Sequence, residues 1–240
     1  MIRSLDVAAT PAAAAARTPA AIAVVIDVLR ATSTIVTALE NGAAGIVPVR
    51  EPDEAIAVMR RLGRARTLLC GERKSRLIEG FDLDNSPASY ARERVDGKTL
   101  AFTTTNGTRA LVDAARDATI VYCAALLNRD AIVQRLVASD GDARLHCAGS
   151  EGAPSFEDIL CAGAIVDALM KVDTSLAISD AARAAATVYA ANAKRLTTAL
   201  ASGTHARSLI AAGFAADVAA CALLDISHCV PVYVDGMICP

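Results

Sequence analysis

The chain has 240 residues, a formal net charge of −2, a 3% share of aromatic residues and no tryptophan. This charge argues against nucleic-acid binding, which requires a basic face. Because hydrophobic residues make up 54% of the chain but few are aromatic, the core must consist mainly of Val, Ile, Leu and Ala, as is typical of parallel strands covered by alanine-rich helices.

The N-terminal segment could be mistaken for a signal peptide because residues 12–16 are all alanine. Asp6, Pro11 and Arg17 interrupt this region, and the leucine-rich segment that a signal peptide requires does not follow it. The apolar run 20–26 has the length of a strand and is far too short to cross a membrane. We therefore expect a cytoplasmic protein without a membrane segment.

Short apolar runs alternate with longer helical patterns along the chain. The predicted strands are Ala21–Asp27, Gly45–Val49, Thr67–Cys70, Thr99–Thr103, Thr119–Cys123, Arg144–Cys147 and Pro231–Val234. The predicted helices are Thr32–Asn41, Pro52–Leu62, Ser86–Arg94, Thr105–Ala115, Asn128–Ala138, Ser155–Met170, Asp180–Ala201, His205–Ala212 and Phe214–Leu224. Strands that alternate with helices indicate βαβ units. We therefore predict one layered α/β/α domain over residues 1–240, with a largely parallel or mixed sheet.

Within this domain, residues 1–125 and 126–240 are expected to form two sub-lobes. After residue 170 the pattern is mainly helical, which predicts a cap over the sheet or a packing surface for a homodimer. The segments Asp27–Thr34 and Thr103–Arg109 each form a hydroxyl-rich turn between a strand and a helix. An internal βα duplication would explain this similarity, although any βαβ protein can offer such spacing by chance.

Polar residues gather at three points where a predicted strand leads into a helix. These segments are Asp27–Thr34, Thr103–Arg109 and Gly149–Asp158, and a charged loop, Cys70–Pro87, lies between the first two in sequence. In an open α/β sheet, ligands bind beyond the carboxyl ends of the strands. We therefore expect the functional site to form where these segments meet.

The hydroxyl-rich turns suit an anionic ligand. The start of a helix has unpaired N–H groups and partial positive charge, so it attracts phosphate. Gly107 would let the backbone approach the ligand, and Arg30 and Arg109 could supply bidentate charge. The alternative is that the Thr and Ser residues are ordinary helix caps. The presence of two such turns, each with an arginine, favours anion binding.

Acidic residues near these turns suggest a metal ion. Asp27 ends a run of six apolar residues, so its carboxylate needs a cation or hydrogen bonds. Magnesium would meet this need because it takes one or two protein carboxylates together with phosphate oxygens; Arg30 or the next helix start is the alternative partner. Glu157 and Asp158 begin a predicted helix with capping-box spacing, so Asp158 could instead cap that helix. Glu72 lies in the charged loop together with Asp82, and both could simply be solvated.

Most known phosphate-handling motifs are absent. The chain lacks the G-x-x-x-x-G-K-[ST] motif of a P-loop, and Leu29, two residues after Asp27, stands where a haloacid-dehalogenase phosphatase has a second Asp. The segment Cys70–Arg76 fits the C-x5-R spacing of cysteine-dependent phosphatases, but so does Cys123–Arg129. The alternative is that Cys70 is a buried strand end. The seven cysteines form no C-x-x-C pair, which argues against zinc and thioredoxin-type sites.

The three histidines, His146, His205 and His228, stand apart from one another in the sequence. We expect each of them to be a hydrogen-bonded structural residue rather than a metal ligand. His228 is a weaker candidate for a general acid.

The long, ordered strings that carry the remaining signal cover nearly the whole chain: Val25–Thr34, Cys70–Arg73, Gly80–Pro87, Thr103–Leu111, Cys147–Gly149, Glu157–Ala164 and Asp217–Cys221. Together they resemble the magnesium-dependent 2-phosphosulfolactate phosphatase family. The resemblance implies a layered α/β/α fold and hydrolysis of (2R)-phospho-3-sulfolactate to 3-sulfolactate and phosphate, a step toward coenzyme M. One position departs from the family pattern, because Asp84 replaces the glycine of Asp-Leu-Gly-Asn-Ser-Pro. Asp tolerates positive φ, but near the phosphate its charge would weaken anion binding.

These observations predict a magnesium-dependent phosphatase in which water or Asp27 attacks phosphorus. Arginines would meet the phosphate, carboxylate and sulfonate of the substrate. The residues assigned to catalysis are Asp27, Arg30, Asn106 and Arg109. Those assigned to substrate binding are Thr32, Ser33, Glu72, Arg73, Asn85, Ser86, Thr103, Thr104, Thr105 and Gly107, and the metal ligands are Asp27 with Glu72, Asp82 or Asp158. The alternatives are another small phosphate ester as substrate, catalysis through Cys70, and a non-catalytic anion-binding module.

Overall fold

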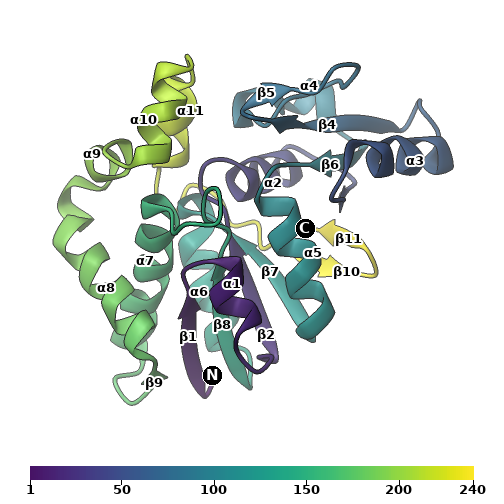
Figure 1. The fold of residues 1–240 in the computed structure, drawn as a ribbon. Coiled ribbons are helices and arrows are strands. Elements are labelled where there is room, and N and C mark those ends of the chain that lie inside the picture. Colours follow the sequence, from purple (N-terminus) through teal and green to yellow (C-terminus); the bar gives the residue numbers. More distant parts are fainter.

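The computed structural model describes residues 1–240 and is built around one 11-stranded sheet (Figure 1). The strands are β1 (Ser4–Ala8), β2 (Ile22–Ile26), β3 (Gly45–Pro48), β4 (Thr67–Arg73), β5 (Arg76–Leu77), β6 (Thr99–Thr103), β7 (Ile120–Ala124), β8 (Asp142–Cys147), β9 (Ala177–Ile178), β10 (Val232–Val234) and β11 (Met237–Cys239). The α-helices are α1 (Pro11–Ala15), α2 (Ala31–Glu40), α3 (Pro52–Leu62), α4 (Arg92–Val95), α5 (Gly107–Asp117), α6 (Arg129–Val137), α7 (Phe156–Val172), α8 (Asp180–Asn192), α9 (Leu196–Ala201), α10 (Thr204–Ala211) and α11 (Ala215–Cys221). Three 3-10 turns complete the set: η1 (Pro87–Ser89), η2 (Leu126–Asn128) and η3 (Ala193–Arg195).

The sheet is mixed but mostly parallel, which confirms the predicted α/β class. Its strand order is β5-β4-β6-β3-β11-β10-β7-β2-β8-β1-β9. Parallel pairs join β4, β6 and β3 on one side and β7, β2, β8, β1 and β9 on the other. The central strand β2 is buried at all five positions, as expected for a parallel strand that is covered on both faces.

The C-terminal hairpin β10–β11 lies between the two parallel groups (Figure 1). It is antiparallel to both of its neighbours: Val232 pairs with Tyr122 of β7, and Ile238 pairs with Ile46 of β3. The connection from β2 through α2 to β3 crosses this hairpin in one direction, and the connection from β6 through α5 to β7 crosses it in the other. Such a reversal of strand order is where open α/β sheets bind ligands.

Alanine-rich helices cover the sheet closely. A side chain on Gly163 of α7 would lie 2.1 Å from the carbonyl oxygen of Ala185 in α8, so these two helices approach almost backbone to backbone. The largest apolar cluster, of 36 buried residues, includes β2, β8, α7 and α8, and a second cluster of 21 includes α2, α5 and Ile238. No helix is both long and apolar enough to span a lipid bilayer.

Several elements differ from the predictions, each for a local reason. The predicted helix 86–94 is split into η1 and α4, because Ser86 before Pro87 is extended, as residues before proline tend to be. The predicted helix 180–201 is interrupted by the 3-10 turn η3. The short strands β1, β5, β9 and β11 and helix α1 were not predicted. Strand β4 continues three residues beyond the predicted end at Cys70, and this extension carries Glu72.

We predict that the hairpin stabilises the whole sheet. Replacing Ile238, which is fully buried, with Ala should lower the free energy of unfolding by about 2–5 kcal/mol, because the substitution leaves a cavity between β3 and β10. Urea unfolding followed by circular dichroism would measure the change. The matched control is Val234→Ala on the same hairpin, where 49% of the side chain is exposed; its effect should stay within about 0.5 kcal/mol. Equal effects of the two substitutions would contradict the prediction.

Candidate active site

A cavity of about 780 Å³ opens at the carboxyl ends of β2, β4 and β6. Asp27 and Thr104 directly follow β2 and β6, and Glu72 lies near the end of β4. The loop 150–156 and helix α10 complete its lining. The cavity therefore lies beyond the carboxyl ends of the strands, the region in which the sequence predicts a ligand site.

Asp27 is a buried carboxylate without a basic partner. Its side chain forms no salt bridge, and its one hydrogen bond is from the Ala31 N–H to Oδ1, at 3.3 Å. Burial raises the pKa of Asp27 to about 6; His205 opposes this rise, whereas the charge of Glu72 adds to it. The Thr32 hydroxyl accepts the Asp27 N–H at 3.0 Å and donates to the Asp27 carbonyl at 2.8 Å. Thr32 therefore fixes the backbone of Asp27 and does not line the cavity.

Asp158 forms hydrogen bonds with the loops that follow β2 and β8. Its Oδ1 accepts the Val28 N–H at 2.9 Å, and its Oδ2 accepts the Gly149 N–H at 3.0 Å. Burial, followed by the negative charge of Asp27, raises the pKa of Asp158 well above its ordinary value. The Ser33 hydroxyl donates to the Val28 carbonyl at 2.8 Å in the same loop, whose Leu29–Arg30 peptide is cis. Asp158 thus holds the loops after β2 and β8 and does not itself line the cavity.

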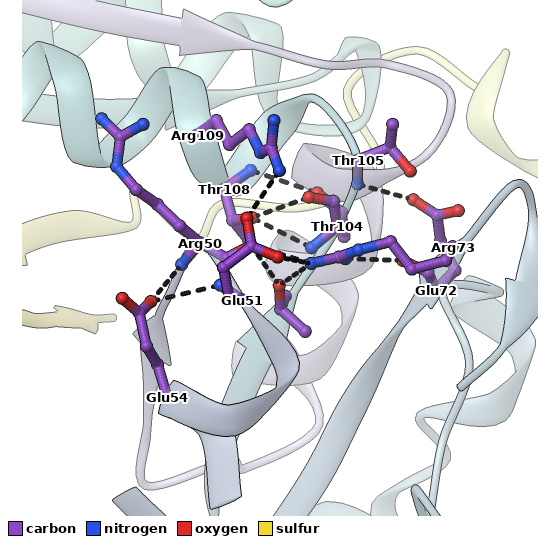
Figure 2. Close-up of polar contacts among 10 residues, drawn as sticks. Arg50, Glu51, Glu54, Glu72, Arg73, Thr104, Thr105, Thr108 and Arg109 are labelled. Atoms are coloured by element: carbon purple, nitrogen blue, oxygen red, sulfur yellow. Dashed lines mark hydrogen bonds and ion pairs between the residues drawn. The ribbon is translucent and has the colours of Figure 1, made fainter. Parts of the chain in front are cut away.

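Glu72 lines the cavity and joins two turns. Figure 2 shows its contact with Thr105. One carboxylate oxygen accepts the Thr105 N–H at 2.8 Å, and the other accepts the Ser75 N–H at 2.7 Å. The buried carboxylate has no basic partner. It therefore couples the β4–β5 turn to the turn that precedes α5.

The start of α5 has the features of a phosphate site. Thr104, Thr105 and Asn106 line the cavity just before the helix begins. Thr104 and Thr108 cap each other, since the Thr104 hydroxyl accepts the Thr108 N–H at 3.1 Å and the Thr108 hydroxyl accepts the Thr104 N–H at 2.9 Å. A side chain at Gly107 would lie 2.5 Å from Asp27 Oδ2 and from the Ala31 Cβ. Only glycine fits there, and the starts of α2 and α5 meet at Asp27.

Arg30 is buried and lines the cavity. Its guanidinium forms a 2.6 Å ion pair with Asp217 and stacks 4.1 Å above the ring of Phe214. The Ser86 hydroxyl donates to the other Asp217 oxygen at 2.7 Å. The charge of Arg30 is thus balanced within the chain, and its position is fixed by α11.

The other two predicted arginines lie outside the cavity lining and converge on Glu51 (Figure 2). Arg109 contacts one Glu51 oxygen at 2.7 Å, and Arg73 approaches the other at 3.5 Å. Arg73 also donates to the Thr103 hydroxyl at 3.0 Å, and that hydroxyl contacts the carbonyl of Arg50. Arg73 and Thr103 therefore brace the segment between β3 and α3 instead of facing the cavity.

Asn85 lines the cavity, and its side-chain oxygen is buried without a hydrogen-bond partner. Asp84, the residue that replaces the family glycine, does not have positive φ and does not line the cavity. Its carboxylate accepts the Ser86 N–H at 3.0 Å and the Ser89 hydroxyl at 2.8 Å. The Asp84 carboxylate therefore stabilises η1 and does not contribute negative charge to the cavity lining.

The structure does not bring Asp82 or Cys70 into the cavity lining. Asp82 forms an ion pair with Arg64 at 2.5 Å and accepts the Leu69 N–H at 2.8 Å. The hydrogen bond from Arg64 is the main reason why the pKa of Asp82 is lowered. Cys70 is fully buried, and burial raises the pKa of its thiol. A buried, protonated thiol is a poor nucleophile.

Sequence reasoning missed three groups of the site. His205 of α10 lines the cavity, and its Nδ1 lies 2.9 Å from Glu157 Oε1. Burial lowers the pKa of His205, but the hydrogen bond and the charge of Glu157, together with the charges of Asp27 and Asp158, raise it overall. Lys74 and Ser75, at the tip of the β4–β5 hairpin, also line the cavity. The pair Glu157–His205 has no signal in the sequence because 48 residues separate its members.

The cavity contains more acidic than free basic charge. Asp27, Glu72 and Glu151 line it, whereas Arg30 is already paired, which leaves Lys74 and His205 as balancing cations. The chain contains no group of three His, Cys, Asp or Glu side chains arranged to hold a metal ion. Magnesium does not need such a group, because one or two carboxylates, water and substrate phosphate suffice. Asp27, with an oxygen free of hydrogen bonds, fits that mode of binding.

Comparison with known proteins gives a consistent result. The family described as "2-phosphosulpholactate phosphatase" matches residues 8–236. A "Probable 2-phosphosulfolactate phosphatase" of Caldanaerobacter subterraneus is 44% identical over 215 residues, which cover 90% of this chain and 88% of the relative. Relatives with the same description in Symbiobacterium thermophilum and Thermotoga petrophila are 42% and 43% identical, each over 90% of this chain and over 93% and 90% of the respective relative.

We predict that Gly107 is required for the contact between α2 and α5. In Gly107→Ala, the new methyl group would overlap Ala31 and the Asp27 carboxylate, so the free energy of unfolding should fall by about 1–3 kcal/mol. Thermal and urea unfolding would measure this loss. Arg116→Ala, an exposed change on the same helix, is the control and should alter stability by less than about 0.5 kcal/mol. A Gly107→Ala variant as stable as the control would show that the two helix starts are not in tight contact.

Proposed function

The chain belongs to the 2-phosphosulfolactate phosphatase family, and we propose that it hydrolyses (2R)-phospho-3-sulfolactate to 3-sulfolactate and phosphate with the help of magnesium. The observation that carries this proposal is the position of Asp27. Its carboxylate is buried without a basic partner between the starts of α2 and α5. It lines a cavity of about 780 Å³, which is large enough for a small ester with several charges.

Asp27 would hold the magnesium ion, and Glu72 of the same cavity is the second proposed ligand. When bound, the ion supplies positive charge that neutralises the phosphoryl oxygens and the charge that develops in the transition state. Asp158 accepts a hydrogen bond from the Val28 N–H and so fixes the backbone next to Asp27. Asp82 is not part of the proposed set because Arg64 engages its carboxylate.

The phosphoryl group would bind at the start of α5. Thr104, Thr105 and Asn106 present polar groups there, and the first N–H groups of the helix carry partial positive charge. We place the carboxylate and the sulfonate of the substrate near Arg30 and Lys74, two cationic side chains that line the same cavity. Arg30 is already oriented by Asp217, so it offers its remaining N–H groups in a fixed geometry.

A homodimer and a cytoplasmic location, both expected from the sequence, stay predictions. The helical C-terminal third has exposed apolar side chains at Leu223 and Ile226, of which 47% and 62% are accessible. Such side chains are common at contacts between subunits. Light scattering would measure the oligomeric state.

We predict that Asp27→Asn abolishes magnesium-dependent turnover. The amide keeps the shape but loses the charge that would hold the ion, so kcat/KM should fall on the order of 10³-fold or more. Phosphate release from (2R)-phospho-3-sulfolactate, with magnesium and with a chelator, measures activity. Calorimetric titration with magnesium measures binding of the ion independently of turnover. The control is Asp53→Asn, a change of the same chemistry on the exposed face of α3.

Two outcomes would contradict this proposal. Wild-type turnover by Asp27→Asn would remove Asp27 from the reaction, and full activity in the chelator would remove the metal. A wild-type protein that releases no phosphate from any of a panel of phosphorylated hydroxy acids would favour the alternative of a non-catalytic anion-binding module.

We also predict that Cys70→Ala keeps wild-type kcat/KM. Cys70 lies outside the cavity lining and is fully buried, so its loss should affect packing alone and lower stability by about 1 kcal/mol. Steady-state kinetics and thermal unfolding of the same preparation would separate the two effects. Loss of turnover in a folded Cys70→Ala protein would instead support the cysteine-dependent mechanism.

A further inference from the structure

A carboxylate–imidazole pair joins the interior to the cavity, because His205 lines the cavity and its partner Glu157 does not. The pair has no part in the phosphate or metal sites described above. Glu157 is 1% exposed, and its Oε1 lies 2.9 Å from Nδ1 of His205. Its other oxygen, Oε2, is buried without any hydrogen-bond partner. The His205 side chain remains 22% exposed and lines the cavity from α10. Glu157 thus belongs to the interior, whereas His205 can reach a bound substrate.

Glu157 determines the state of the His205 ring. An ionised carboxylate can only accept a hydrogen bond, so Nδ1 must carry the proton in this contact, and Nε2 is left for other partners. Asp27 after β2 and Asp158 of α7 also act on His205 and favour its charged form. Together these acidic groups raise the pKa of His205 although its burial opposes them. A protonated His205 can donate a hydrogen bond through Nε2.

Hydrolysis of an alkyl phosphate needs such a donor. The transition state of phosphoryl transfer places negative charge on the leaving oxygen, and an alcohol is a poor leaving group unless that charge is neutralised. Arg30 cannot give up a proton in a protein, and Lys74 lies at an exposed hairpin tip with no ion pair that would position it. His205 lines the cavity, can release a proton, and is held in place by a buried carboxylate.

We propose that His205 is the general acid that protonates the leaving oxygen of the substrate, and that Glu157 is the positioning residue that fixes its tautomer and orientation. This inference rests on the proposed phosphatase function and extends it to the leaving-group side of the reaction. It corrects the expectation that His205 has a structural role alone.

An oxygen of the nucleophile, water or the Asp27 carboxylate, forms a bond to phosphorus while the bond from phosphorus to the substrate's C2 oxygen breaks. The electron pair of the broken bond stays on that C2 oxygen, and the proton on Nε2 of His205 moves to it to give the hydroxyl group of 3-sulfolactate. The neutral imidazole then regains a proton from solvent, and an attacking water releases one of its protons to solvent. If the Asp27 carboxylate attacks instead, a water molecule next hydrolyses the acyl phosphate, which yields phosphate and regenerates Asp27.

A comparison of esters with different leaving groups distinguishes a general acid from a structural residue, because only the loss of an acid affects the two esters differently. We expect His205→Gln to reduce kcat for (2R)-phospho-3-sulfolactate by about 10²-fold or more, which is the usual contribution of a general acid. With 4-nitrophenyl phosphate, whose leaving group is stable without a proton, the same variant should keep close to wild-type kcat. Arg207→Ala, an exposed change on the same helix, is the control and should leave both rates unchanged.

The pH dependence and the ring itself supply a second measurement. A general acid must be protonated, so wild-type kcat should fall as pH rises through the pKa of His205, above the ordinary value of 6.5. His205→Gln should lose this basic limb, and Glu157→Gln should move it to lower pH. Nitrogen-15 NMR of the three histidine rings would show Nδ1 of His205 protonated in the wild type and a lower pKa in Glu157→Gln, without any substrate.

The outcomes distinguish this inference from the proposed function. If wild-type protein releases no phosphate from the natural substrate, the proposed function fails. If wild type is active but His205→Gln loses equal fractions of its rate on both esters, or keeps its basic limb, His205 is not the acid. If the aryl ester is not a substrate, the pH profile decides. An unchanged His205 pKa in Glu157→Gln would remove the positioning role of Glu157.

Discussion

The site depends on one buried carboxylate that the chain does not neutralise. Asp27 lies where the starts of α2 and α5 meet, and no basic side chain forms a salt bridge with it. Surrounding groups hold its backbone: Thr32 bonds both its N–H and its carbonyl, and Asp158 fixes the next N–H along the chain. Because a buried unpaired charge is costly, this rigid arrangement persists only if a ligand or a proton supplies the missing charge.

In contrast to Asp27, the arginines near the site are paired with acidic residues of the chain. Motif reasoning assigned Arg30, Arg73 and Arg109 to the anionic groups of the substrate, but each forms an ion pair with an acidic residue. Arg109 and Arg73 converge on Glu51, so their charges are engaged outside the cavity lining. The cavity consequently has little net positive charge of its own, and a multiply charged anion gains most when a cation enters with it. This charge balance is a physical argument for the proposed metal dependence, and the number of arginines alone does not reveal it.

The predictable parts of the molecule are those in which local pattern and fold agree. The helix Pro52–Leu62 and the strand Thr99–Thr103 have the predicted bounds, because a capping box and a continuous apolar run mark them locally. Asp27 and Thr104 could be placed in one cavity because they follow parallel strands. His205 could not be placed, since only the tertiary fold brings it to Glu157, which lies 48 residues away in the sequence. The position of Arg73 outside the cavity lining could not be predicted for the same reason, because its partner Glu51 lies just before α3.

The two ionisable groups that line the cavity from β2 and α10 act on each other. His205 lowers the pKa of Asp27, and Asp27 raises that of His205, so each favours the charged form of the other. A deprotonated Asp27 and a protonated His205 are the states that the proposed chemistry needs, one to hold a cation near phosphorus and one to supply a proton to the leaving oxygen. The buried Glu157 reinforces the second state without occupying the cavity. This electrostatic coupling offsets only part of the cost of burying these charges, and in the proposed reaction it would favour the required state at both ends of the scissile bond.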